Sequence, residues 1–314
     1  MRLWQQTMIG LARSQAATNF MQNSRLMSRF SSQFTGGKDV REAANRAREM
    51  FMQGITSSLF VLGEYEEKKE NATAMVKELE AILPLLAERG VDPHISVDPT
   101  QIGSMVSWDL CQKNATQLGQ AVKNIESDRR KVLMVDMEDS SVTQNTLDLY
   151  YELEKQQVPT AITIQAYLKR SKQDIEGIVA SGGMVRLVKG AFAENKDIVL
   201  TSRIDIDQSY RELVDLLFSE QARKTGVYPV IGSHDHNMIE FTANLARERG
   251  WNADQWEVEM LLGVRPDYQQ KLVQQGISVR VYLPYGEKWW PYSVRRIGEN
   301  PRNLWFVLRS ILKV

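Results

Sequence analysis

A short aromatic and charged segment near the end of the sequence contains residues that could bind a small anion. Residues 282–303 read YLPYGEKWWPYSVRRIGENPRN. On a helix, one face of this segment would carry the residues spaced i, i+3, i+4 and i+7, namely Tyr292, Arg295, Arg296 and Glu299. Two neighbouring guanidinium groups can hold a carboxylate through several charge-assisted hydrogen bonds. The segment is therefore either a clamp for a small anion or a solvated basic helix end.

The composition excludes several classes of protein. The chain has 314 residues, with 39 basic and 39 acidic side chains, and a nucleic-acid-binding protein would show a basic excess. No apolar run reaches the roughly 18 residues that a membrane-spanning helix needs. The single cysteine, Cys111, rules out an intrachain disulfide framework and suits a reducing compartment. We therefore expect a cytoplasmic protein with no integral membrane segment and no nucleic-acid partner.

The first 38 residues differ in composition from the rest. They contain no acidic residue, and their basic residues are Arg2, Arg13, Arg25, Arg29 and Lys38. Mitochondrial transit peptides have this composition, and so do basic leader helices of bacterial enzymes. We predict a basic helical leader over residues 1–38 and a single catalytic domain over residues 39–314. A targeting peptide, and hence a mitochondrial location, stays open as the alternative.

After residue 39, short β-rich runs alternate with amphipathic helical patterns. Eight such runs are ITSSLFVLGE, HISVD, KVLMVDME, PTAITIQAYL, GMVRLVKGAF, YPVIGSH, WEVEMLLG and ISVRVYLPYG. The clearest helical patterns cover residues 71–88, 112–125, 144–156, 208–225 and 237–249. Eight βα units with no G-x-G-x-x-G sequence favour a closed (β/α)₈ barrel over a dinucleotide-binding sheet.

Polar residues stand at or near the end of every predicted strand, where the active site of such a barrel is found. In chain order they are Glu64, Asp98, Asp136, Glu138, Gln165, Arg186, Lys189, Ser233, His234, Glu259 and Tyr282. A single edge residue could simply meet solvent, but packing alone does not explain all eight strands. The sequence therefore predicts a polar site at the mouth of the barrel.

Six motifs in this order resemble the proline dehydrogenase family. They are VDMEDSS (135–141), IQAYLKR (164–170), RLVKGAF (186–192), GSHD (232–235), EMLLG (259–263) and VRVYLPYGEKWWPYSVRRIGEN (279–300). The last is the most specific. The resemblance runs from about residue 29 to about residue 308 and is closest to the short, monofunctional bacterial type.

This resemblance implies a distorted barrel that binds FAD and oxidises L-proline to 1-pyrroline-5-carboxylate, with a hydride passing to the flavin N5 atom. A quinone would then accept the electrons, and peripheral contact with a membrane is compatible with that role. Cofactor-binding positions carried over by the motifs are Gln165, Arg186, Lys189, Gly190, Ala191, Ser233 and His234. The clamp reading of residues 292–299 follows from the same resemblance.

The resemblance also assigns the substrate site. Arg295 and Arg296 would grip the substrate carboxylate, and Glu299 would order the arginine face. Tyr282 and Tyr292 would pack around the substrate ring, with Asp136 beside the pocket. Tyr285, Trp289 and Trp290 would form an apolar wall that excludes water. The pair His234 and His236 offers too few ligands for a strong metal site, so we expect no metal.

Two residues depart from the family pattern. Asp98 stands where the family has a lysine that helps to neutralise the substrate carboxylate, and Phe192 replaces a tyrosine. These departures leave a second function open, in which the same flavin barrel acts on another cyclic or secondary amine, such as a modified or carrier-bound proline. A third alternative is a flavin-binding relic without activity, which the intact arginine face disfavours.

Overall fold

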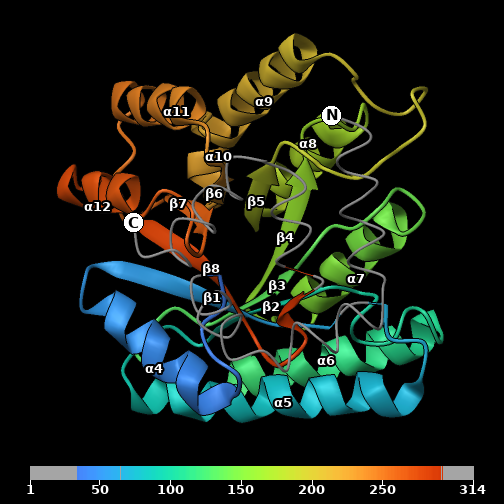
Figure 1. Ribbon diagram of the computed structural model, residues 1–314. Coiled ribbons are helices and arrows are strands. Elements are labelled where there is room, and N and C mark those ends of the chain that lie inside the picture. Colours follow the sequence, from blue (N-terminus) through green and yellow to red (C-terminus); the bar gives the residue numbers. More distant parts are fainter. Residues whose placement is uncertain (1–33, 64, 291, 293–314) are drawn as a thin grey trace.

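The structure, a computed structural model, describes residues 34–63, 65–290 and 292. Eight parallel strands form a closed barrel in the order of the sequence, and helices surround the strands (Figure 1). The strands are β1 (Ile55–Val61), β2 (His94–Val97), β3 (Val132–Val135), β4 (Thr160–Gln165), β5 (Met184–Val188), β6 (Tyr228–Gly232), β7 (Glu257–Leu261) and β8 (Val279–Tyr285). This confirms the predicted barrel.

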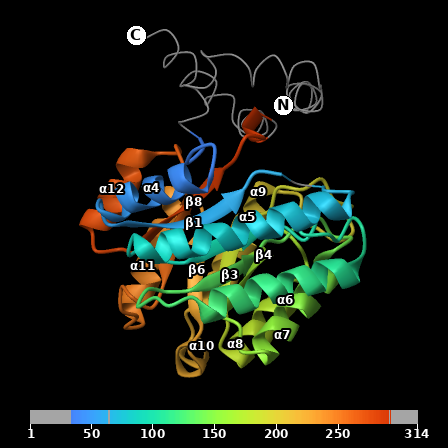
Figure 2. The ribbon, with the colours of Figure 1, turned by 90° about the horizontal axis from the view of Figure 1, so that it is seen from below.

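The helices alternate with the strands, and one precedes the barrel. In the described ranges they are α4 (Val40–Phe51), α5 (Lys69–Glu88), α6 (Trp108–Asn124), α7 (Thr143–Lys155), α8 (Ser171–Ser181), α9 (Arg203–Leu217), α10 (Glu220–Thr225), α11 (His236–Glu248) and α12 (Pro266–Gln274). Helices α5 and α6 lie side by side against the outside of the barrel (Figure 2). No described helix is long and apolar enough to cross a membrane.

Most predicted helices agree with the structure to within a few residues, but the pattern over residues 208–225 is two helices. Helix α9 ends at Leu217, and the Ser219 side chain accepts a hydrogen bond from the Ala222 amide at the start of α10. Serine at this position satisfies an amide that has no partner within a new helix. The single predicted helix was therefore wrong, because a cap in its interior restarts the helix.

Side-chain alternation along the strands separates the core from the barrel interior. Leu59 and Val61 of β1 belong to the large apolar core that also contains helix residues such as Leu79. Ser58, on the opposite side of the strand, forms a 2.7 Å hydrogen bond with Ser96 of β2. Since side chains alternate between faces with a period of two, the outer face of the barrel is apolar and the inner face carries polar groups.

Candidate active site

A buried arginine in the barrel interior joins its own strand to three others. Arg186 of β5 donates from Nη1 to Glu259 Oε1 of β7 at 2.9 Å and from Nη2 to Asp136 Oδ1, which directly follows β3. Its Nε atom donates to Thr163 Oγ1 of β4 at 3.0 Å. The exposed fractions of Arg186, Asp136 and Glu259 are 5%, 7% and 3%. We call Arg186, Asp136, Glu259 and Thr163 the Arg186 cluster.

Burial and charge act in opposite directions on this cluster. Burial raises the pKa of Asp136 and of Glu259, and the Arg186 guanidinium only partly offsets it. Burial opposes the charge of Arg186 itself, but the two carboxyl groups outweigh it and raise the pKa of the guanidinium. The arginine therefore stays charged, while two carboxyl groups compete for one cation.

Tyr282 connects the Arg186 cluster to the end of β8. Its hydroxyl donates to Asp136 Oδ2 at 2.9 Å, and its ring lies 5.3 Å from the Phe60 ring and 5.2 Å from the Arg186 guanidinium carbon. Burial raises the pKa of Tyr282 well above its ordinary value, and the negative charges of Asp136 and Asp98 raise it further. The phenol is therefore a neutral hydrogen-bond donor.

Asp98 stands directly after β2 and is half-buried. Its carbonyl oxygen accepts the amides of Gln101 at 3.0 Å and Ile102 at 3.3 Å in the turn that follows. Thr100 in this turn donates from its amide and its hydroxyl to the Glu138 carboxylate, at 2.9 and 2.6 Å. These bonds hold the turn against the loop after β3, so that Asp98 and Asp136 are presented from neighbouring strands.

A hydrogen bond connects Gln165, the last residue of β4, to Glu138 in the loop after β3. The Gln165 Nε2 atom donates to the Glu138 carbonyl oxygen at 2.8 Å, and both side chains are buried. The amide group thus ties the end of β4 to the loop after β3.

Lys189 lies directly after β5, half-buried between two carboxylates. Its ammonium group pairs with Asp207 of α9 and, at 2.9 Å, with Asp235 before α11. Burial alone would raise the pKa of Asp235, but its bonds to Lys189 and to the Asn237 amide lower it. The amide of Asp235 in turn donates to Ser233 Oγ at 3.1 Å. The ends of β5 and β6 are therefore fixed to each other by charge.

The other predicted cofactor-binding residues lie on the same rim. Gly190 has φ +101°, and a Cβ atom there would meet Tyr167 Cδ1 at 2.1 Å. Ala191 is exposed and His234 is half-buried, and the His234 carbonyl oxygen accepts from Arg265 Nη1 at 3.0 Å. The structure thus brings the predicted residues of β4, β5 and β6 to one side of the barrel mouth.

The predicted arginine clamp lies outside the described residues. This applies to Arg295, Arg296 and Glu299, and also to Glu64. Tyr292 is described and buried, as are Trp289 and Trp290, whose rings meet edge to face at 5.9 Å.

The prediction that Tyr285 joins Trp289 and Trp290 in an apolar wall around the substrate was wrong. Tyr285 belongs to the apolar core outside the barrel, because it lies an odd number of residues after the inward-facing Tyr282 and so points to the opposite face.

Two members of the Arg186 cluster were not predicted as site residues. Glu259 was recognised only as a polar strand residue, and Thr163 was not singled out. The available signal was the pattern E-V-E in β7, which places Glu257 and Glu259 on the same inward face. Within the described ranges, no group of three or more His, Cys, Asp or Glu side chains is arranged to hold a metal ion.

The closed parallel barrel, with charged side chains buried near the carboxyl ends of its strands, defines a (β/α)₈ barrel with the site arrangement of an enzyme. A model of the proline dehydrogenase family matches residues 43–309. The chain belongs to the proline dehydrogenase family, which places it among the oxidoreductases.

Similar proteins agree with this assignment. The chain is 32% identical over 279 residues to proline dehydrogenase 2 of Bacillus subtilis, covering 88% of this chain and 89% of that protein. It is 30% identical over 287 residues to the proline dehydrogenase of Deinococcus radiodurans, covering 89% of each.

Solved structures of longer proteins share the fold. Proline utilization A of Bdellovibrio bacteriovorus, inactivated by N-propargylglycine, matches with a TM-score of 0.79 at 21% identity. The match covers 87% of this chain and 33% of that one. Proline utilization A of Corynebacterium freiburgense matches with a TM-score of 0.76 at 22% identity, covering 99% of this chain and 34% of that one.

Proposed function

We propose that this protein oxidises L-proline to 1-pyrroline-5-carboxylate and uses FAD as its cofactor. The observation that carries the proposal is the Arg186 cluster with Tyr282, buried near the carboxyl ends of the strands in a chain of the proline dehydrogenase family. The flavin would supply the redox chemistry by accepting a hydride at N5. The task of the protein is then to bind, orient and shield the substrate.

The residues at the ends of β4, β5 and β6 fit a flavin. Gly190 adopts a positive φ with its Cα against the Tyr167 ring, and a side chain there would displace the segment that follows β5. Arg186 provides a permanent cation, and Gln165, Lys189 and Ser233 provide polar groups nearby. Together with Ala191 and His234, these residues would hold the cofactor.

The substrate would lie toward β8 and the residues that follow it. Tyr282 is a neutral phenol fixed by Asp136, and it would pack on the substrate ring together with the buried Tyr292. Arg295 and Arg296 would hold the carboxylate, ordered by Glu299, and Trp289 and Trp290 would exclude water. A quinone is the proposed electron acceptor, used by a cytoplasmic protein that contacts the membrane peripherally.

The cofactor is tested first. We expect purified protein to be yellow and to release FAD on denaturation without proteolysis. A colourless protein that takes up no added FAD would refute the enzyme proposal. The remaining interpretation would be a barrel without enzymatic activity. Replacing Arg295 or Arg296 with Met should weaken substrate binding by about 2–5 kcal/mol, because the buried substrate carboxylate would lose one of its two cationic partners. Unchanged kinetics would place both side chains in solvent.

A second candidate function is oxidation of a different cyclic or secondary amine, and Asp98 favours it. Its negative charge acts on the Tyr282 hydroxyl, and at about 4 Å in an effective dielectric near 20 it would oppose a substrate carboxylate by about 4 kcal/mol. Because Asp98 is half-exposed, solvent screening reduces this value. A substrate with an added cation or a masked carboxylate would avoid the repulsion.

Dye-linked oxidation separates the two candidates. The substrates are proline, hydroxyproline, pipecolate, N-alkylprolines and proline esters. If the second candidate holds, an ester or N-alkyl derivative is oxidised faster than free proline, and Asp98→Lys raises turnover of free proline, more so with Phe192→Tyr added. Efficient oxidation of proline that Asp98→Lys does not change would eliminate it and leave the first proposal standing.

A further inference from the structure

The two carboxyl groups of the Arg186 cluster are unequally hydrogen-bonded. Asp136 accepts three bonds, from Arg186, Thr163 and Tyr282. Glu259 accepts one, from Arg186 Nη1 to Oε1, and its buried Oε2 atom has no hydrogen-bond partner among the described residues. An ionised carboxylate needs several donors to replace water. Asp136 has them and Glu259 does not.

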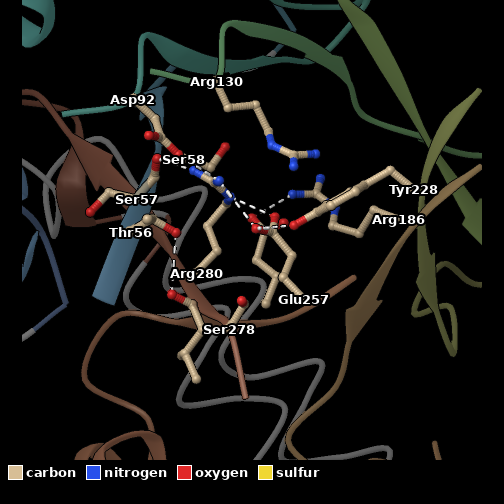
Figure 3. Close-up of polar contacts among 12 residues, drawn as sticks. Thr56, Ser57, Ser58, Asp92, Arg130, Arg186, Tyr228, Glu257, Ser278 and Arg280 are labelled. Carbon is tan, nitrogen blue, oxygen red and sulfur yellow. Dashed lines mark hydrogen bonds and ion pairs between the residues drawn. The ribbon is translucent and has the colours of Figure 1, made fainter. Parts of the chain in front are cut away.

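A second buried ion cluster adjoins Glu259. Arg280 of β8 donates to both oxygens of Glu257 at 2.6 and 3.1 Å and to Asp92 at 2.8 Å, and we call these three residues the Arg280 cluster. Tyr228 also donates to Glu257, at 3.3 Å. Figure 3 shows Arg280 between Asp92 and Glu257. Glu257 is thus a buried carboxylate with three hydrogen-bond donors, two residues from Glu259 on the same strand.

We propose that Glu259 holds a proton and acts as a positioning residue for Arg186, so that the guanidinium balances Asp136 alone beneath the substrate site. Near neutral pH the Arg186 cluster then consists of one cation, one anion and one neutral acid. The neutral acid still accepts the bond from Arg186 through Oε1, and its proton belongs on Oε2. The bond fixes the guanidinium without adding a second negative charge.

The charged neighbours on each strand support this distribution. Glu259 faces Arg186 on β5, Asp136 after β3 and Arg280 on β8, with Glu257 on its own strand. Burial raises the pKa of Glu259 most, and Glu257 and Asp136 raise it further, against the two arginines. Arg280 donates two hydrogen bonds to Glu257, and the negative charge of Glu257 offsets most of the attraction between Arg280 and an ionised Glu259.

The proton has a consequence for the reaction, and this part rests on the proposed function. When Glu259 ionises at alkaline pH, a negative charge is added next to Arg186, and the guanidinium is less able to stabilise negative charge on a bound ligand. We expect ionisation of Glu259 to add to the fall in flavin midpoint potential and in kcat at high pH, and Glu259→Gln, which keeps the acceptor oxygen and cannot ionise, to remove that added part.

The proton itself is tested on substrate-free protein, independently of the proposed function. The infrared spectrum of the unsubstituted protein at pH 7 should contain the carbonyl stretch of a buried, protonated carboxylic acid. The band should move when glutamate is labelled with carbon-13, stay in place when aspartate is labelled, and disappear in Glu259→Gln. The proposal is overturned by the absence of the band, by a band that moves with labelled aspartate, or by one that survives in Glu259→Gln.

A second variant covers the case in which Glu259→Gln does not fold. In Glu259→Asp the acid is retained on a shorter side chain, so the band should change from sensitivity to labelled glutamate to sensitivity to labelled aspartate. If glutamate labelling still moves the band in this variant, another residue holds the proton and the inference is wrong. Failure of proline oxidation with a confirmed acid band would instead remove only the proposed function.

Discussion

Replacing Arg186 with Met should destabilise the protein in a way that depends on pH. The substitution removes the donors to Glu259, Asp136 and Thr163 and leaves two buried carboxyl groups without a cation. Breaking a buried ion pair in this manner costs about 3–5 kcal/mol. We expect a loss of that size in the free energy of unfolding near pH 8.

The pH dependence follows from the protons bound. Burial raises the pKa of both carboxyl groups above their ordinary values, and without Arg186 both would have to be protonated in the folded state. The unfolded chain loses these protons near pH 4, at about 3.9 for Asp and 4.3 for Glu. A folded state that retains more protons than the unfolded state loses stability as pH rises.

The native protein retains one proton in this cluster and Arg186→Met retains two. The destabilisation by the variant should therefore shrink by about 1.4 kcal/mol for each pH unit on lowering the pH toward 5. Urea unfolding followed by fluorescence at pH 5, 6, 7 and 8 measures it, with Arg130→Met, an exposed arginine stacked on Tyr228, as the control. A loss that is equal at every pH would show that the variant takes up no second proton, and would refute the proposal that Arg186 holds Asp136 in its ionised form.

Three further predictions concern positions in the described part of the chain. Arg280→Met should lower the free energy of unfolding by about 3–5 kcal/mol, because two buried carboxylates lose their cation. Arg280→Lys keeps the charge and should cost less. Equal losses for the two variants would show that the positive charge of Arg280 does not contribute to stability. Gly190→Ala should destabilise the protein by more than about 1 kcal/mol, since the new Cβ would overlap Tyr167. It should also reduce FAD uptake, because the segment after β5 would have to move. Ala191→Gly, at the exposed neighbour, should do neither, and normal FAD uptake by Gly190→Ala would contradict a role of this segment in holding the cofactor. Burial raises the pKa of the Cys111 thiol to about 12, so a thiol reagent should react with the native protein far more slowly than with protein unfolded in urea, and equal rates would show that the thiol is accessible.

Local patterns in the sequence were sufficient to predict the barrel. Each strand is a short β-rich run such as TAITIQ in β4, and within the described residues each strand from β1 to β7 is followed by a helix. These properties depend on residues close together in the chain, so the eight-stranded barrel and the polar strand ends could be predicted before the tertiary structure was known. The family assignment rests on the same local motifs. The domain boundary at residue 39 and the roles of Arg295, Arg296 and Glu299 stay predictions.

Only the tertiary structure decided which charged groups share a partner. Along the chain, Arg186 is 50 residues from Asp136 and 73 residues from Glu259. Nothing local in the sequence pairs these residues. Closure of the barrel brings β3, β5 and β7 around one interior, where burial makes each missing hydrogen bond costly. The structure also placed Tyr285 in the outer apolar core and not in the predicted wall around the substrate, because the side chains of a strand alternate and only one set can face the interior.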